Sequence, residues 1–461
     1  MKKYLLMLVS AAMAAALLFA CQKPAGDKED EDEDEVELAA LECEVSATEN
    51  WIFDSKPEFT LTMTNPNNKE ITANIGIWVV TDKIKSKYTT QESITVPANA
   101  TKNYTFSPTG DYEPGFYKLT VKVDKEYVAK SSGFGVAPQN LVSAADMQQN
   151  FDSYWAGVKA QLPDITDPAN VSLTKISSKS TSTHTAYFVE IKSVPDGPTG
   201  DPVTVRGYYY EPTGSGKYPV LMHFYGYDSN PPGKMYFPYA EGSRVYAEFY
   251  LSNRGQMINA RTAAQRDDGI EKDFKNDYGD WFSFQFGQKE DGWFYRGAFM
   301  DCVQAVNFMA TRSTSDMNNL FAEGSSQGGA YSYAAAALSD YPFTAIAPCV
   351  AFLGDYPDYF EIVSWPAETA RANQGDMTDA EMYRFLSYFD TKNLATRINA
   401  AVIACSALDD GTCPPHTNTA PFNNLPTQDK VMYYYPHWGH NIPKDWPGKY
   451  IEFFGKRIKT Q

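Results

Sequence analysis

The residues with the clearest chemical meaning are Gly324-Ser325-Ser326-Gln327-Gly328-Gly329, which fit the pattern Gly-x-Ser-x-Gly with Ser326 as the central serine. A short apolar stretch, residues 320–322, precedes them, and a small-residue, helix-prone run, residues 330–338, follows. A strand, a sharp turn and a helix in this order form a nucleophile elbow, which points a serine hydroxyl away from the sheet. Glycines are needed because larger side chains would clash where the strand and the helix pack closely. The pattern therefore predicts acyl-transfer chemistry at Ser326.

A serine hydroxyl is a poor nucleophile and needs a base, which in turn needs an orienting acid. In α/β-hydrolases these follow in the order Ser, Asp or Glu, His. Of the five histidines, His184 and His223 precede Ser326 and fall outside this order. His437 and His440 both follow the expected last strand, residues 430–435, and either one fits the base. His416 lies after the preceding strand, where the acid is expected.

The acid should follow the strand predicted at residues 400–405, and the next loop holds Asp409 and Asp410. We expect one of these carboxylates to orient the histidine and the other to be a solvated loop residue. The oxyanion needs two backbone N–H donors. The first is the residue after the nucleophile, Gln327, and the second is expected in the loop 225–228, after the strand predicted at 218–224.

The elements that must position these residues alternate between strands and helices over roughly 320 residues, which indicates an α/β fold with a mostly parallel sheet. An amphipathic pattern predicts a helix at residues 144–162, and a second helix is predicted at 295–311. The predicted strands are residues 185–192, 203–210, 218–224, 343–350, 400–405 and 430–435.

Residues 38–138 read instead as all-β. Phe59, Leu61 and Met63 alternate with threonines, and turn clusters separate several such runs. This pattern is typical of a small immunoglobulin-like β-sandwich. We interpret it as a spacer, with glycan binding as the alternative. The α/β catalytic domain would then span residues 139–461.

The N-terminus predicts export. Residues 1–20 carry two lysines and an apolar run, which is typical of a signal peptide, and Leu18-Phe19-Ala20-Cys21 resembles a bacterial lipobox with Cys21 as the lipidated residue. Within residues 21–37, the run Asp27–Glu37 has nine acids and one lysine, so we expect a disordered tether. The prediction is an outer-membrane lipoprotein exposed at the cell surface; a periplasm-facing protein and a plain signal peptide are the alternatives.

Composition excludes several classes of function. The formal net charge is −17 and no basic patch stands out, which argues against a nucleic-acid partner. No His-Glu-x-x-His or paired-cysteine motif predicts a metal, and no glycine loop predicts a nucleotide cofactor. Four cysteines lie in apolar surroundings and are expected to be buried small hydrophobes, although the sequence assigns no disulfide status to them: Cys302, Cys349, Cys405 and Cys413.

Read together, three separated motifs resemble the acetylxylan esterases and cephalosporin-C deacetylases of carbohydrate esterase family seven, within the α/β-hydrolase superfamily. They are Asn253-Arg254-Gly255-Gln256, the Ser326 elbow, and the acid and histidine loops. Further similarity runs through residues 291–296 and 385–390, and the resemblance covers residues 140 to 455. It implies deacetylation of acetylated xylooligosaccharides and related small acetyl esters.

The resemblance also implies roles for single residues. Ser326 would be the nucleophile, Asp410 rather than Asp409 the acid, and His440 the base. The oxyanion donors would be the main chains of Gln327 and Tyr227, and the supporting motif would be Arg254, Gly255 and Gln256.

Two positions differ from the family pattern: Asn441 replaces a glutamate after the histidine, and Tyr225 replaces a histidine before Gly226. The family's hexameric ring is not carried over, because an added domain and a lipid anchor would obstruct it. Three alternatives remain: a serine peptidase, another acyl esterase on the same fold, and an inactive surface glycan-binding lipoprotein.

Overall fold

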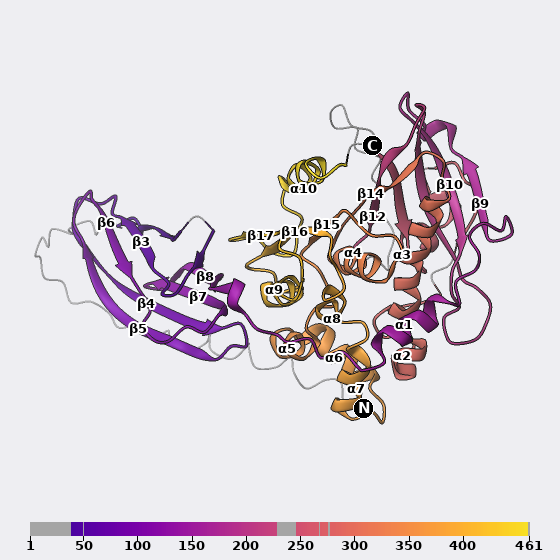
Figure 1. The fold of residues 1–461 in the computed structure, drawn as a ribbon. Coiled ribbons are helices and arrows are strands. Elements are labelled where there is room, and N and C mark those ends of the chain that lie inside the picture. Colours follow the sequence, from indigo (N-terminus) through magenta and orange to yellow (C-terminus); the bar gives the residue numbers. More distant parts are fainter. Residues whose placement is uncertain (1–37, 49, 228–245, 267, 275–276, 460–461) are drawn as a thin grey trace, which may run out of the picture. The chain divides into compact units, whose positions relative to one another are not determined.

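The structure of the protein is a computed structural model, which describes residues 38–459 except 49, 228–245, 267 and 275–276 (Figure 1). The predicted signal peptide, Cys21 and the acidic tether lie outside the described residues. Leu41–Gln461 form one compact unit. Within the described part of the chain, no helix combines the length and the apolar character that a membrane span requires.

Residues 42–136, which we call the N-terminal β region, form two sheets, ordered β1-β3-β6 and β2-β8-β7-β4-β5. The predicted alternation is present, because Phe59, Leu61 and Met63 are fully buried in the core of this region. The immunoglobulin-like topology stays a prediction. The strands are β1 (Glu42–Ser46), β2 (Ile52–Phe53), β3 (Phe59–Thr64), β4 (Ile71–Thr81), β5 (Ser86–Val96), β6 (Thr101–Phe106), β7 (Gly115–Val123) and β8 (Glu126–Val136).

The rest of the chain is built on a nine-stranded mixed sheet ordered β17-β16-β15-β14-β12-β13-β11-β10-β9. The six strands from β17 to β13 run parallel, and β11, β10 and β9 pair antiparallel, so the expected mixed α/β fold is present. The strands are β9 (Val171–Lys175), β10 (His184–Lys192), β11 (Thr204–Pro212), β12 (Tyr218–Phe224), β13 (Ala247–Ser252), β14 (Ser315–Ser325), β15 (Ala345–Cys349), β16 (Ala401–Ala407) and β17 (Lys430–Tyr435).

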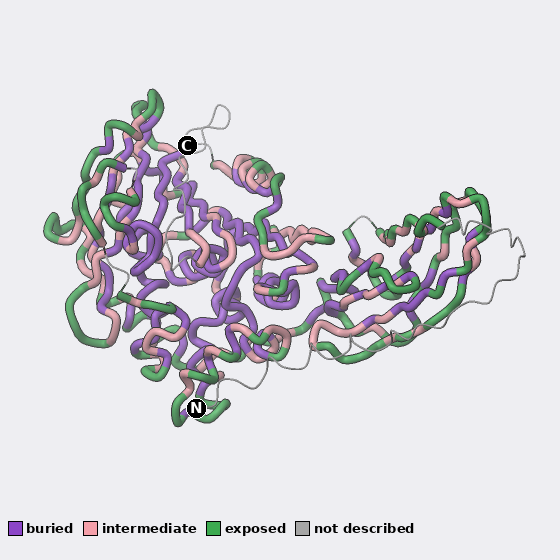
Figure 2. Tube along the Cα trace, turned by 180° about the vertical axis from the view of Figure 1, so that it is seen from behind, coloured by how far each residue is buried: buried purple, intermediate pink, exposed green. Residues whose placement is uncertain are grey.

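Helices cover both faces of this sheet, as Figure 1 shows, and the buried residues follow its central strands in Figure 2. On one face lie α1 (Phe151–Lys159), α3 (Phe294–Ala310), α4 (Gln327–Leu338) and α8 (Thr391–Ala395); α10 (Trp446–Gly455) covers the other. Neighbouring residues of one strand face opposite layers: Val220 and Met222 enter the first core and Leu221 enters the second. The remaining helices are α2 (Lys289–Gly292), α5 (Tyr356–Ile362), α6 (Ser364–Asn373), α7 (Asp379–Leu386) and α9 (Pro415–Asn423).

The helix predicted at residues 144–162 was wrong at its start, because α1 begins only at Phe151. The segment before it is held by tertiary contacts. The N–H of Asp146 donates to Asn393 Oδ1 at 2.9 Å, and its carboxylate accepts from Asn393 Nδ2 at 2.9 Å and lies 3.3 Å from Lys392 Nζ. These bonds with α8 replace the intrahelical ones that a longer α1 would make.

A charged cluster joins the N-terminal β region to the α/β part. His416, at the start of α9, lies with Nδ1 3.1 Å from Asp82 Oδ2 and with Nε2 2.9 Å from Asp358 Oδ2 and 3.3 Å from Asp355 Oδ2. Lys83 Nζ pairs with Asp358 Oδ1 at 2.6 Å. Burial lowers the pKa of His416, but its interactions with Asp355, Asp358 and Asp82 outweigh burial and raise the pKa to about 11. The imidazole is therefore a cation held among carboxylates.

This cluster predicts a pH-dependent stability. The folded pKa of His416 lies above its unfolded value of about 6.5, so its contribution is complete below about pH 6.5 and is lost as the pH rises towards about 11. We expect the difference in the free energy of unfolding between wild type and His416→Gln to be larger at about pH 6 than at about pH 9. Urea unfolding at both pH values measures it. Other titrating groups, such as His223, cancel in the difference, and a gap that stays constant with pH would contradict the assignment.

Candidate functional site

Ser326 lies in the turn between β14 and α4 with φ 57° and ψ −122°, a backbone conformation that is costly for a residue with a side chain. The turn is closed by glycines that have no room for a Cβ. A Cβ on Gly324 would lie 2.3 Å from Gly328 O, and one on Gly328 would lie 2.1 Å from Phe224 O. The strand, strained turn and helix predicted around Ser326 are therefore present.

Three sequence-predicted residues meet at this turn. His440 Nε2 lies 2.9 Å from Ser326 Oγ, and His440 Nδ1 lies 2.8 Å from Asp410 Oδ2. The other oxygen of Asp410 accepts the N–H groups of Thr412 and Cys413, each at 2.8 Å. The Asp410 side chain is fully buried, whereas that of His440 is 27% exposed, so the imidazole faces solvent on one side and a fixed carboxylate on the other.

The two rival candidates point elsewhere. His437 contacts the ring of Trp51 edge-on, with centroids 4.4 Å apart. Asp409 is half-buried, and its Oδ1 accepts the N–H of Gly133 in β8. The expectation that the second aspartate is a solvated loop residue was therefore wrong. Burial, which disfavours the ionised carboxylate, raises the pKa of Asp409.

The two residues expected to donate to an oxyanion flank Ser326. Gln327 begins α4, and its side chain is held by the hydroxyl of Tyr295, which donates to Oε1 at 3.0 Å. Gly226 lies against Ser326, because a Cβ built on it would be 3.6 Å from Ser326 Cβ. The next residue, Tyr227, packs its ring on Trp281 with centroids 4.5 Å apart and donates its hydroxyl to Asp280. The directions of the Gln327 and Tyr227 N–H groups stay a prediction.

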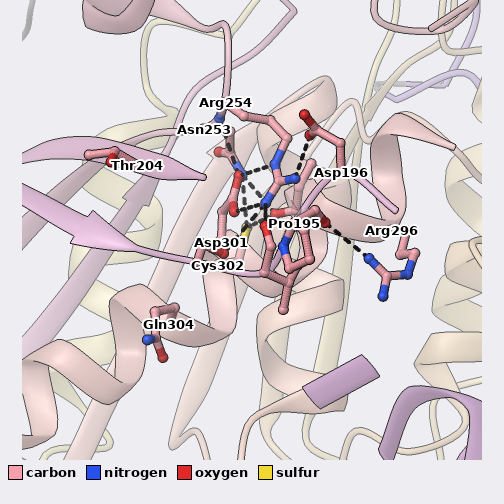
Figure 3. Close-up of polar contacts among 12 residues, drawn as sticks. Pro195, Asp196, Thr204, Asn253, Arg254, Arg296, Asp301, Cys302 and Gln304 are labelled. Carbon is pink, nitrogen blue, oxygen red and sulfur yellow. Dashed lines mark hydrogen bonds and ion pairs between the residues drawn. The ribbon is translucent and has the colours of Figure 1, made fainter. Parts of the chain in front are cut away.

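The Arg254-Gly255-Gln256 motif contacts this loop through the side chain of Gln256. Figure 3 shows Arg254 with Asp301 and Asp196. Arg254 is buried and binds Asp301 through two nitrogens, Nε–Oδ2 at 3.0 Å and Nη2–Oδ1 at 2.6 Å, and binds Asp196 Oδ1 through Nη1 at 2.8 Å. Two residues along, Gln256 Nε2 donates to Gly226 O at 2.5 Å and to Tyr225 O at 3.2 Å. The buried ion pair fixes the motif, and Gln256 then holds the loop beside Ser326.

Sequence reasoning missed Asp301 and Asp196, the two carboxylate partners of Arg254. A signal was available for Asp301, since it is an acid inside the apolar helix predicted at 295–311, and a fully buried acid needs a cationic partner. No comparable pattern marks Asp196, which stands in a loop.

The two departures from the family pattern have visible contacts. Asn441 accepts the indole N–H of Trp438 through its backbone oxygen at 2.9 Å, which fixes the loop just before and after His440. The backbone carbonyl of Tyr225 accepts a hydrogen bond from the side chain of Gln256. Tyr225 also lines a cavity of about 430 Å³ together with Gly226 and Ser325. This cavity lies beside the elbow and does not include Ser326 among its lining residues.

One group of the described residues has the composition of a metal site: Asp355, Asp358 and His416, whose ligand atoms lie within 4.8 Å of one another. Lys392 Nζ lies 3.0 Å from Asp355 Oδ1 and Lys83 pairs with Asp358, so ammonium groups and the His416 imidazolium supply the positive charge. A protonated imidazole has no lone pair for a metal, and we assign this cluster to ion pairing. Cys302, Cys349, Cys405 and Cys413 are buried, as expected, and all four are free thiols, which the sequence alone did not assign.

Comparisons with known proteins show which proteins this chain is similar to. The acetyl xylan esterase (AXE1) family profile matches residues 139–456. Acetyl esterase Axe7A of Xylanibacter ruminicola is 25% identical over 336 residues, which is 71% of this chain and 71% of that protein.

Two solved acetyl xylan esterases resemble the same part of the chain. Acetyl xylan esterase 1 from Thermoanaerobacterium sp. JW/SL YS485 has a TM-score of 0.56 at 23% identity, covering 70% of this chain and 98% of that one. The enzyme from Paenibacillus sp. R4 has a TM-score of 0.55 at 25% identity, covering 69% and 98% respectively. Nearly all of each solved chain is thus matched by about 70% of this one.

The carboxylate contacts separate the roles of the two aspartates. Asp410→Asn leaves one oxygen, which the N–H groups of Thr412 and Cys413 hold, so an amide NH2 faces His440 Nδ1. We expect kcat to fall by about four orders of magnitude. Asp409→Asn keeps an oxygen for the Gly133 N–H and should change kcat by less than about twofold. Steady-state hydrolysis of p-nitrophenyl acetate by both variants measures this, and the reverse ranking would assign the acid to Asp409.

The buried ion pair predicts a large stability effect. Arg254→Ala leaves Asp301 buried without its cation, which should cost about 3–5 kcal/mol in the free energy of unfolding. Arg254→Lys keeps the charge but loses the two-nitrogen contact, so we expect an intermediate loss. Urea unfolding of the two variants measures both, and a loss of less than about 1 kcal/mol for Arg254→Ala would contradict this role.

Proposed function

The chain belongs to the acetyl xylan esterase family and is a carboxylic ester hydrolase, and from this premise we propose that it removes acetyl groups from acetylated xylooligosaccharides or related small acetyl esters. The observation that carries the proposal is the chain of hydrogen bonds from Ser326 through His440 to Asp410 at the strained turn. These are the nucleophile, base and orienting acid that ester hydrolysis requires.

In the proposed mechanism, Ser326 Oγ attacks the acetyl carbonyl carbon while its proton moves to His440 Nε2, 2.9 Å away. The carbonyl oxygen becomes an oxyanion, which accepts hydrogen bonds from the N–H groups of Gln327 and Tyr227. When the tetrahedral intermediate collapses, the proton on Nε2 passes to the departing sugar oxygen. An acetyl group then remains on Ser326.

A water molecule completes the cycle. His440 Nε2 takes a proton from this water, whose oxygen attacks the acetyl carbon, and the second intermediate releases acetate as the proton returns to Ser326 Oγ. Asp410 accepts the proton of His440 Nδ1 at 2.8 Å, which keeps Nε2 free to accept a proton on each half of the cycle.

The same proposal includes the domain organisation and the location of the protein. Residues 139–461 would be an α/β-hydrolase domain and residues 38–138 an immunoglobulin-like sandwich. A signal peptide at 1–20, lipid on Cys21 and an acidic tether to residue 37 would hold the enzyme at the outer membrane, exposed at the cell surface.

The first test is acetate release from acetylated xylooligosaccharides, measured beside hydrolysis of p-nitrophenyl acetate. We expect wild type to act on both, and Ser326→Ala to lose many thousandfold in kcat on each, because the nucleophile is gone. Hydrolysis of p-nitrophenyl acetate alone would indicate that the natural substrate is another acyl ester. Cleavage of a panel of peptides would favour the serine peptidase. Sugar binding without ester hydrolysis would favour the inactive glycan-binding protein. If Ser326→Ala hydrolyses the esters at nearly the wild-type rate, Ser326 is not the nucleophile.

A further inference from the structure

The N-terminal β region contacts the loop that carries Asp410 on its N-terminal side. Leu408, 3% exposed, lies in the hydrophobic core of that region rather than in the core of the α/β sheet. Asp409, the next residue, accepts the N–H of Gly133. A Cβ on Gly133 would lie 2.0 Å from Leu408 O, so β8 is packed directly against the two residues that precede Asp410.

The same region contacts this loop again on its C-terminal side. His416, the second residue of α9, follows shortly after the loop, and its Nδ1 lies 3.1 Å from Asp82 Oδ2 of the N-terminal β region. Between these two anchors a cavity of about 210 Å³ is lined by Tyr117 and Lys118 on one side and by Asp410 and Gly411 on the other. The contact is therefore made at a few anchors rather than along the whole loop.

The loop that carries His440 is held as well. Trp51 packs edge-on against His437, three residues before the base. The two loops are also bonded to each other, since the N–H of Asp409 donates to Trp438 O at 3.0 Å and the N–H of Leu408 donates to Tyr435 O at 2.9 Å. A displacement of Asp409 would therefore be felt in both loops.

We propose that the N-terminal β region is a positioning element for the Asp410–His440 pair, acting through Asp409 on the acid loop and Trp51 on the histidine loop. The inference rests on the proposed function. The family profile matches residues 139–456, so Trp51 and Gly133 lie outside the matched part of the chain, whereas Asp409 lies within it. A misplacement of about 1 Å at a reacting group can lower a rate about a hundredfold, so anchors of this kind act on kcat.

The test is Asp409→Ala, which removes the acceptor of the Gly133 N–H. We expect kcat for p-nitrophenyl acetate to fall about tenfold with KM within about twofold, since the loop shifts but the acyl pocket remains. Asp409→Asn keeps the acceptor oxygen and should restore kcat to within about twofold of wild type. Trp51→Ala should lower kcat in the same way through the histidine loop.

A matched control separates positioning from general destabilisation. Asp124 also accepts a backbone N–H, that of Asn74 at 2.9 Å, at an exposed turn of the same region. Asp124→Ala should leave kcat unchanged even if it lowers Tm by as much as Asp409→Ala. All rates are taken well below each Tm, with far-UV circular dichroism as the check on folding.

The outcomes are distinct. If Asp409→Ala and Trp51→Ala lower Tm but keep kcat within about twofold, the positioning role is overturned while the esterase stands. If Asp124→Ala lowers kcat as much as they do, the effect is one of stability and the role is again overturned. A wild-type protein that neither hydrolyses the ester nor reacts with a fluorophosphonate at Ser326 overturns the proposed function, and the positioning role with it.

Discussion

The strained backbone of Ser326 is the constraint on which the site depends. A residue with φ 57° and ψ −122° carries a cost of about 1–3 kcal/mol, and it persists only where its surroundings leave no alternative. Here the N–H of Ser326 donates to Cys349 O at 2.9 Å and its carbonyl accepts the N–H of Phe352 at 3.0 Å. Both bonds tie the turn to the neighbouring β15 and the loop after it. The serine is thus held from the next strand as well as from its own glycines.

The order of the strands explains how distant residues reach this turn. β14, β15, β16 and β17 are successive parallel neighbours, so the loops that follow them leave the same edge of the sheet. Ser326 follows β14, Asp410 follows β16 and His440 follows β17, which brings them within hydrogen-bond distance despite their separation in sequence. Such an edge, at the carboxyl ends of the strands, is where α/β proteins place their ligands.

The sequence could predict those features that depend on the pattern of neighbouring residues. The strand at 218–224 has the same bounds in the structure, because a buried run between turn residues leaves one solution, and the elbow is specified by its own glycines. What it could not predict depends on distant partners. Asp409 reaches Gly133 across 276 positions and His416 reaches Asp82 across 334, so nothing near either residue marks it as part of a contact. The prediction of where α1 starts was wrong for the same reason, because Asp146 bonds to Asn393 of α8.

The two sides of the site are held by interactions of different kinds. On the Gly226 side, Arg254 and Asp301 are both buried, so their attraction is little screened by salt, and Gln256 links this rigid pair to Gly226. On the side of Asp410 and His440, part of the support comes from pairs such as Lys83 with Asp358, whose side chains are 24% and 31% exposed. Such pairs weaken as the ionic strength rises, and the His416 cluster also weakens as the pH rises. High ionic strength and high pH should therefore displace Asp410 and His440 first, while the turn at Ser326 and the loop at Gly226 stay in place.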